Sequence, residues 1–209
     1  MVEWDQILLR NEYRPERPDE IVVNFASVLE KRRAGRVLDL GCGAGRHIIY
    51  FVEKGFETYG ADISEIGLAL TQKRLRSHRL EAEIIRCDMK SIPCVNSGFD
   101  AVLCVQTIYH QRLEEIRQTI FEIHRILKKK GLLLANFHSK RSGKYGVGTK
   151  VEDDTFMQQK GPERGVLHHF FNESELQELL EGFKVDLEVK EKKIGNYSRS
   201  RFIVLAEKM

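Results

Sequence analysis

One stretch decides the fold of this chain: Val37-Leu38-Asp39-Leu40-Gly41-Cys42-Gly43-Ala44-Gly45. Its first four residues form a short apolar run, which is typical of a buried strand. Glycine then occupies every second position up to the start of an amphipathic helix. At such a turn, glycine permits positive φ and leaves room for a ligand to lie against the backbone. We therefore expect a strand, a glycine turn and a helix at a binding site.

Short apolar runs and amphipathic segments alternate downstream of this stretch. In one of these segments, Ile116, Ile120, Ile123 and Leu127 recur at helical spacing, and Gly131 supplies a stop. Alternation of this kind favours an α/β fold with a parallel sheet and helices on both faces. The predicted strands are Val37–Leu40, Thr58–Ala61, Glu83–Arg86, Ala101–Val105 and Leu132–Phe137, and the predicted helices are Gly45–Lys54, Glu65–Ser77 and Leu113–Lys129.

The two ends of the chain differ from this pattern. Two helical segments precede the first strand, the second over Asp19–Lys31, and we interpret residues 1–34 as a helical cap. Near the other end, Asn172 with Glu175 predicts a helix start, and Gly182 ends that helix. Residues 183–189 alternate as a strand, and Phe202–Ala206 follows after a turn near Gly195-Asn196. Strands so close in sequence pair antiparallel.

Residues 139–168 lack clear periodicity and are rich in glycine and charge. A long loop in a compact domain is usually functional or mobile, so residues 138–171 are predicted to be a loop-rich lid over the substrate. The length of 209 residues suits one domain over 1–209 and hardly two.

Composition narrows the function classes. Hydrophobic residues make up 42% and charged residues 31%, and the formal net charge is +3, which neither demands nor excludes a polyanionic partner. The triplet Lys128-Lys129-Lys130 is interpreted as favourable charge at a helix C-terminus. The four cysteines form no C-x-x-C pair, so we expect no metal site and a reducing compartment. Neither a signal peptide nor a membrane span is expected, which indicates a cytoplasmic protein.

Two carboxylates follow the second and third predicted strands. Asp62 lies 21 residues after Gly41, where a carboxylate can accept both hydrogen bonds of a ribose diol. Asp88 ends the third strand and can accept from an exocyclic amine such as that of adenine. The spacing G-x-G-x-G places Arg46 where dinucleotide-binding proteins have a third glycine, and this argues against nicotinamide and flavin cofactors.

These features together resemble the class I S-adenosylmethionine-dependent methyltransferases over roughly residues 36–205. The resembling stretches are Val37–Gly45, Tyr59–Ser64, Cys87–Met89, Phe99–Val105 and Ile123–Leu134. The ending around Leu167–Phe171 is similar to small-molecule methyltransferases of the quinone-biosynthesis and tellurite-resistance type. The resemblance implies a Rossmann-like, doubly wound, seven-stranded sheet, mostly parallel with an antiparallel last strand. It also implies S-adenosylmethionine as cofactor and a small-molecule methyl acceptor.

The resemblance further implies roles for matching positions. Asp39 and the backbone of Gly41 and Gly43 would contact the methionine part of the cofactor. Asp62 would hold the ribose and Ile63 would pack on the adenine. The expected cofactor-binding residues are Asp39, Gly41, Gly43, Asp62, Ile63, Cys87, Asp88, Met89, Val105 and Gln106.

A general base is needed only if the acceptor keeps its proton at neutral pH. The candidates are Tyr109, His110 and His138, followed by His168 and His169. Tyr13 is a candidate for a lid over the cofactor or for the core.

Two other functions stay open, namely an RNA methyltransferase and a cofactor-binding module without turnover. The segment Gln106–His110 lacks the Asn/Asp-Pro-Pro-Tyr/Phe motif of enzymes that methylate base amines, so nucleic acid is the less favoured acceptor. The sequence indicates no oligomeric state.

Overall fold

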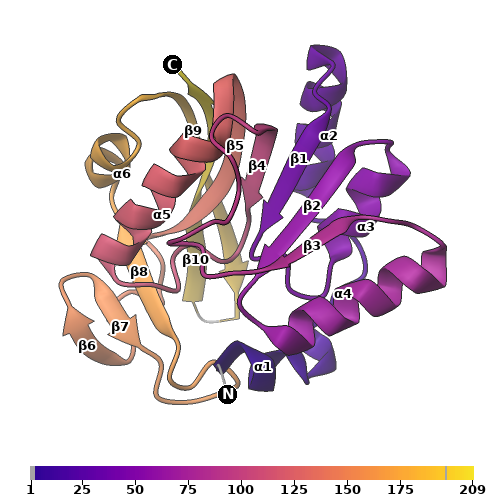
Figure 1. The fold of residues 1–209 in the computed structure, drawn as a ribbon. Coiled ribbons are helices and arrows are strands. Elements are labelled where there is room, and N and C mark those ends of the chain that lie inside the picture. The colour runs from indigo at the N-terminus through magenta and orange to yellow at the C-terminus, as the bar shows by residue number, and fades with distance from the viewer. Residues whose placement is uncertain (1–2, 196) are drawn as a thin grey trace.

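The structure is a computed structural model that describes residues 3–195 and 197–209. Helices flank both faces of a twisted sheet (Figure 1). No helix within these ranges is both long and apolar enough to cross a bilayer. The helical elements are α1 (Glu3–Leu8), η1 (Asn11–Tyr13), α2 (Glu20–Arg32), α3 (Arg46–Glu53), α4 (Glu65–His78), α5 (Leu113–Ile126) and α6 (Glu173–Leu179).

Seven strands follow one another across the sheet in the order β3-β2-β1-β4-β5-β10-β9. The first five are parallel, and β10 is antiparallel to both of its neighbours. The prediction of a mostly parallel, Rossmann-like sheet with an antiparallel last strand is therefore confirmed. These strands are β1 (Arg36–Leu40), β2 (Glu57–Asp62), β3 (Glu83–Arg86), β4 (Phe99–Cys104), β5 (Leu127–Ser139), β9 (Phe183–Ile194) and β10 (Tyr197–Lys208).

The seven predicted strands are present, and within the described residues three short strands from the segment 138–171 extend the sheet. These are β6 (Thr149–Glu152), β7 (Thr155–Met157) and β8 (Leu167–Phe171). β8 pairs with His138 and Ser139 at the end of β5, beyond the last residue that β4 pairs with. These strands are too short to show a period in the sequence.

The third predicted helix ends earlier than expected, at Ile126 rather than Lys129. Leu127 is fully buried in an extended conformation and pairs with Phe99 of β4. Because its apolar side chain fits a helical and a strand pattern equally, the periodicity could not locate this boundary. The lysine triplet therefore lies in β5, where Lys128 Nζ contacts Asp100 Oδ1 at 2.7 Å, and it does not complete the last turn of the helix.

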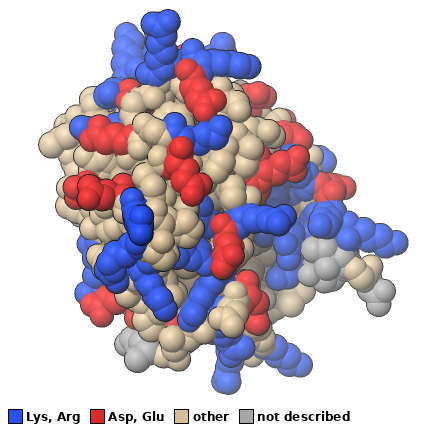
Figure 2. All heavy atoms as spheres, turned by 90° about the vertical axis from the view of Figure 1, so that its right-hand side faces the viewer, with Lys and Arg blue, Asp and Glu red and all other residues tan. Residues whose placement is uncertain are grey.

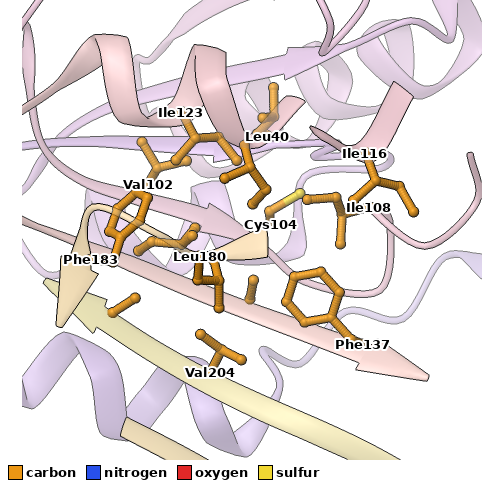
Figure 3. Packing of buried hydrophobic residues seen from close by; sticks show 14 of the residues in the cluster. Leu40, Val102, Cys104, Ile108, Ile116, Ile123, Phe137, Leu180, Phe183 and Val204 are labelled. Atoms are coloured by element: carbon orange, nitrogen blue, oxygen red, sulfur yellow. The ribbon is translucent and has the colours of Figure 1, made fainter. Parts of the chain in front are cut away.

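Strand alternation divides the core between the two faces of the sheet. Leu38, Leu40 and their neighbours pack with α5 and α6 in the cluster of Figure 3, which also includes Phe137 and Val204. Val37 and Leu103 face the other way and pack with α2 and α3. Because helices cover both faces of the sheet, a site can open at the carboxyl ends of its parallel strands.

Side-chain caps fix the starts of three helices. Asp19 accepts from the Ile21 N–H before α2, and Ser64 accepts from the Gly67 N–H before α4. Asn172 and Glu175 cap each other's backbone before α6, which confirms the predicted helix start. Gly195 is in a turn after β9, and Asn196, the second residue of the predicted turn, lies outside the described residues.

Candidate functional site

A cavity of about 660 Å³ opens at the carboxyl ends of β1 to β4, the lower end of the molecule in Figure 1. Its volume suits a small-molecule site. Helix α1 and the first residues of β10 lie at the same end. The predicted site residues that line the cavity are Gly41, Gly43, Asp62, Ile63, Cys87, Asp88, Met89, Val105, Gln106 and His110.

The three glycines of the turn have positive φ, as a tight strand-to-helix connection requires. At Gly41 an added Cβ would lie 2.4 Å from Cγ2 of Thr107, and at Gly45 it would lie 2.6 Å from Oγ1 of Thr71. At these two positions another side chain of the protein therefore excludes a Cβ. The sequence had suggested that this space was left for a ligand. At Gly43 a Cβ would meet only Leu8, at 3.7 Å.

Asp62 connects the glycine turn to the second strand. Its Oδ2 accepts from the Gly43 N–H at 2.7 Å, and its Oδ1 accepts from the Ser64 N–H at 2.8 Å. Burial raises the pKa of Asp62, and these two donors oppose the rise. A carboxylate oxygen has two lone pairs, so each oxygen can accept one further hydrogen bond. Asp62 can thus hold a diol while it fixes the turn.

Asp39 is not among the residues that line the cavity, and its contact with the cofactor stays a prediction. It is 2% exposed, and its Oδ2 has no hydrogen-bond partner among the described residues. That oxygen lies 3.6 Å from Nδ1 of His47, whose Nε2 accepts from the Asp19 N–H. A buried carboxylate oxygen without a partner is costly, so this position suits a ligand that brings a donor to the turn.

Residues after the third strand form another wall of the cavity. Asp88 Oδ1 accepts from the Lys90 N–H at 3.0 Å, and Lys90 Nζ lies 2.6 Å from Glu115. Burial raises the pKa of Cys87 to about 11, so this side chain is a neutral thiol at neutral pH. Ile63 and Met89 make the wall partly apolar, and a flat ring with a polar edge would fit it.

Gln106 follows β4 with a φ of +64°, which is strained for a residue other than glycine. Its N–H donates to Asn136 Oδ1 at 2.6 Å, and its side-chain Nε2 donates to Asp19 Oδ2 at 3.0 Å. These contacts join three elements at the floor of the cavity. Asn136 carries no motif of its own, so its role was invisible in the sequence.

The structure separates the candidate bases. His110 lines the cavity, whereas Tyr109 and His138 do not and are only 2% and 4% exposed. Their rings pack together with centroids 3.9 Å apart, beneath the cavity wall. His168 and His169 are also buried, the first 3.1 Å from Glu163 Oε2 and the second 2.6 Å from Thr155 Oγ1. Of these five candidates, His110 is the one that lines the cavity.

The tautomer of His110 follows from its partner. Nδ1 lies 3.1 Å from the Leu167 carbonyl, and since a carbonyl only accepts, Nδ1 must carry the proton. Nε2 then has the free lone pair. Burial, with a smaller contribution from His168, lowers the pKa of His110 to about 3, so the ring is neutral at neutral pH. The ring can accept a hydrogen bond but is a weak base.

Among the lining residues that the sequence did not reveal are Trp4, Glu163, Arg199 and Arg201. Glu163 accepts from the Tyr13 hydroxyl at 3.2 Å, which links the N-terminal segment to the segment before β8. Burial by itself would raise the pKa of Glu163, but the contact with His168 and the positive charges nearby together outweigh it and lower this pKa to about 2. No residue pattern pairs positions 150 apart, so this contact had no signal in the sequence.

Helix α1 covers the glycine turn. Asp5 Oδ1 accepts from the Ser64 hydroxyl at 2.6 Å, and Leu8 packs near Gly43 and Gly67. Ser64 also donates its N–H to Asp62. The residue that holds α1 is therefore only two positions from the carboxylate at the end of β2.

Comparison with known proteins places this geometry in context. A family model described as a methyltransferase domain matches residues 37–131. YqeM of Bacillus subtilis (strain 168), which its name assigns provisionally to the methyltransferases, is 35% identical over 136 residues, 64% of this chain and 52% of that protein. The glycine/sarcosine N-methyltransferase of Parasynechococcus marenigrum (strain WH8102) is 28% identical over 134 residues, 63% of this chain and 46% of that protein.

Among solved structures, a SAM-dependent methyltransferase from Methanosarcina mazei has a TM-score of 0.76 at 24% identity. The match covers 92% of this chain and 99% of that one. The two proteins therefore share a fold over most of this chain. The chain spans about half the length of the two relatives matched by sequence.

Proposed function

We propose that this chain, which belongs to the class I S-adenosylmethionine-dependent methyltransferases, transfers the methyl group of S-adenosylmethionine to a small-molecule acceptor. The observation that carries the proposal is that one cavity joins the glycine turn and Asp62 to His110. A cofactor site and an acceptor site are thus continuous, as direct transfer between two bound molecules requires.

The residues present fit the cofactor. Asp62 has acceptor capacity for a ribose diol, and Asp39 has a buried oxygen without a partner beside the turn that would hold the methionine part. Ile63 and Met89 offer an apolar surface for the adenine, with Asp88 and Cys87 at its polar edge. Bound there, S-adenosylmethionine would supply an electrophilic methyl group on a sulfonium that leaves as a neutral thioether.

The work left to the protein is alignment and exclusion of water. Val105 and the strained Gln106 would form the floor against which donor and acceptor meet. His110 Nε2 would accept a hydrogen bond from the acceptor and so orient it. With a pKa of about 3, this ring positions the acceptor and does not hold its proton.

The proposal of a small acceptor rests on how the cavity is covered. The Tyr13–Glu163 hydrogen bond and the Asp5–Ser64 hydrogen bond attach N-terminal residues across its opening. We infer that residues 1–34 and 138–171 act as covers within a single domain over 1–209. On the face in Figure 2, Lys and Arg side chains are interspersed with Asp and Glu, whereas an RNA-binding face is usually uniformly basic.

Calorimetry with S-adenosylmethionine and S-adenosylhomocysteine tests the cofactor site. Asp62→Ala should weaken both by about 100-fold or more, because two hydrogen bonds to an ionised group are lost. Asp153→Ala is the matched control, since that side chain is 92% exposed and outside the cavity, and its affinity should equal the parent's. Absence of binding by the parent protein would refute the cofactor and everything built on it.

Turnover is tested with methyl-labelled cofactor and two acceptor pools, a low-molecular-weight cell extract and total RNA. Label should enter the small molecules. Label in RNA would favour the RNA methyltransferase, and cofactor binding without labelled product in either pool would favour a binding module.

A further inference from the structure

The first half of β10 brings two arginines to the cavity. Arg199 and Arg201 are two residues apart on one strand, so their side chains leave the same face of the sheet, and both line the cavity. Ser200 between them is fully buried on the opposite face. Because β10 is antiparallel to β5, its beginning reaches the edge where the parallel strands end. This is the edge at which the cofactor site lies.

Two lysines stand directly opposite these arginines. Arg201 pairs with Lys190 of β9, and Arg199 pairs with Lys192. Side chains of directly paired residues in an antiparallel ladder lie on one face about 5 Å apart, and like charges there destabilise the sheet. No carboxylate of the described residues forms an ion pair with any of the four. Two like-charge pairs therefore follow one another along this ladder, which makes the start of β10 a positively charged part of the cavity wall.

Arg201 is the more deeply placed of the two arginines. Its Nε is buried and has no hydrogen-bond partner among the described residues. Glu163, an acidic residue of the cavity wall, is already engaged, since it pairs with His168 and accepts from Tyr13. A buried guanidinium donor without an acceptor favours a ligand that supplies one.

Ring contacts connect Arg201 to His110. Arg201 is paired across β5 with His138, whose ring lies 5.2 Å from that of His168, and His168 lies 4.9 Å from His110. The His110 ring packs edge-on against Trp4, with centroids 4.7 Å apart. The arginines, His110 and Trp4 all line the cavity, so the end of it beside β10 offers both cations and flat rings to one ligand.

We infer that this end of the cavity binds a flat acceptor that carries an anionic group, carboxylate or phosphate, against Arg199 and Arg201. The inference rests on the proposed function and names the acceptor class for the same site.

The carboxylate of the cofactor itself is the competing partner for these arginines. Arg46 begins α3 directly after the glycine turn, lines the cavity, and is nearer in sequence to the predicted methionine end. Its only ion-pair contact within the described part of the chain is a loose one of 4.0 Å to Asp19. Arg46 is thus available to the cofactor carboxylate, which leaves the β10 arginines for the acceptor.

The test uses three monosubstituted benzenes with the 209-residue protein saturated with S-adenosylhomocysteine: benzoate, phenyl phosphate and benzamide. Ligand-observed NMR titration gives the affinity of each. At least one of the two anions should bind 10-fold or more tightly than neutral benzamide. Arg201→Gln and Arg199→Gln should each lower that preference to under threefold, and Arg201→Lys should keep part of it. Arg76→Gln, an exposed position on α4, removes the same charge and should change nothing.

The affinity for S-adenosylhomocysteine separates the two proposals. If the parent protein does not bind it, the proposed function fails. If the parent binds it and all three probes bind equally or not at all, only the acceptor inference is overturned. It is equally overturned if Arg201→Gln weakens S-adenosylhomocysteine as much as the anion, since Arg201 would then serve the cofactor. A folded Arg201→Gln variant that loses only the anion preference supports the inference.

Discussion

His110 makes the stability of the folded protein depend on mild acid. Its imidazole is enclosed between Trp4 and the cavity wall, and burial lowers its pKa to about 3 in the folded chain. In the unfolded chain the same group titrates near its ordinary value of about 6.5. Between these values the unfolded state binds the proton and the folded state does not. The contribution of His110 to the stability is therefore fully present above about pH 6.5 and is lost as the pH falls toward 3.

The size of the loss follows from the two pKa values. Lowering the pH from 7 to 5 should reduce the free energy of unfolding by about 2 kcal/mol through His110 alone. At pH 5 this figure is set by the unfolded pKa, so a folded pKa one unit higher would change it by only about 0.1 kcal/mol. Burial also lowers the pKa of His138, which adds to the loss in the same direction. Glu163, with a pKa of about 2, has its own effect only below the pH where free glutamate titrates, about 4.3.

Urea unfolding at pH 7 and pH 5 measures this difference in the parent protein and in His110→Gln, which keeps a neutral amide donor for the Leu167 carbonyl. The variant should lose about 2 kcal/mol less than the parent between the two pH values. His78→Gln, at an exposed position on α4, is the control and should follow the parent. Equal losses in the parent and in His110→Gln would refute the reasoning, because the ring would then titrate alike in both states.

Two further changes test the glycine turn and its cover. Gly41→Ala forces a Cβ to within 2.4 Å of Thr107 at a φ of +79°, whereas Gly55→Ala at +85° meets nothing within 4 Å. Both should lose about 1–2 kcal/mol from the backbone, and Gly41→Ala about 1–3 kcal/mol more from the clash; equal melting temperatures would contradict this. Asp5→Ala removes the acceptor of the Ser64 hydroxyl, so it should weaken the binding of S-adenosylhomocysteine by roughly 10-fold. The same variant should be cut faster by trypsin after Arg10, because α1 is held less firmly. Asp186→Ala, an exposed matched control on β9, should alter neither, and unchanged affinity in Asp5→Ala would show that α1 does not stabilise the site.

The parallel half of the fold could be predicted because its signals are local. Each strand there is a short apolar run, and each is followed at once by the residue that enters the cavity. Gly41 follows β1 directly, and Asp62 is the last residue of β2. Asp88 lies in the stretch that follows β3. In a parallel sheet all such positions meet at one edge, so sequence order alone brings them together.

Local signals could not separate a lining residue from the one behind it. Tyr109 and His110 are neighbours, yet one ring is buried and the other lines the cavity. Asp39 likewise matches the family pattern but faces α3, where His47 lies 3.6 Å away. Which of two adjacent side chains reaches a cavity depends on backbone angles after the strand, and residue types do not determine these angles.

The antiparallel strand explains the largest omission. In β10 the residues at the cavity are those at the start of the strand, since the chain enters from the edge where β1 to β5 end. Inspecting the last residues of each predicted strand therefore misses β10, because its cavity residues lie at its start. Register matters as well, because a shift of one residue would turn Arg199 and Arg201 to the opposite face and bring Ser200 into their place. That register is fixed by pairs such as Phe202 with Phe137, 65 residues away in the chain, so the arginines become candidates only once the ladder between β5 and β10 is known.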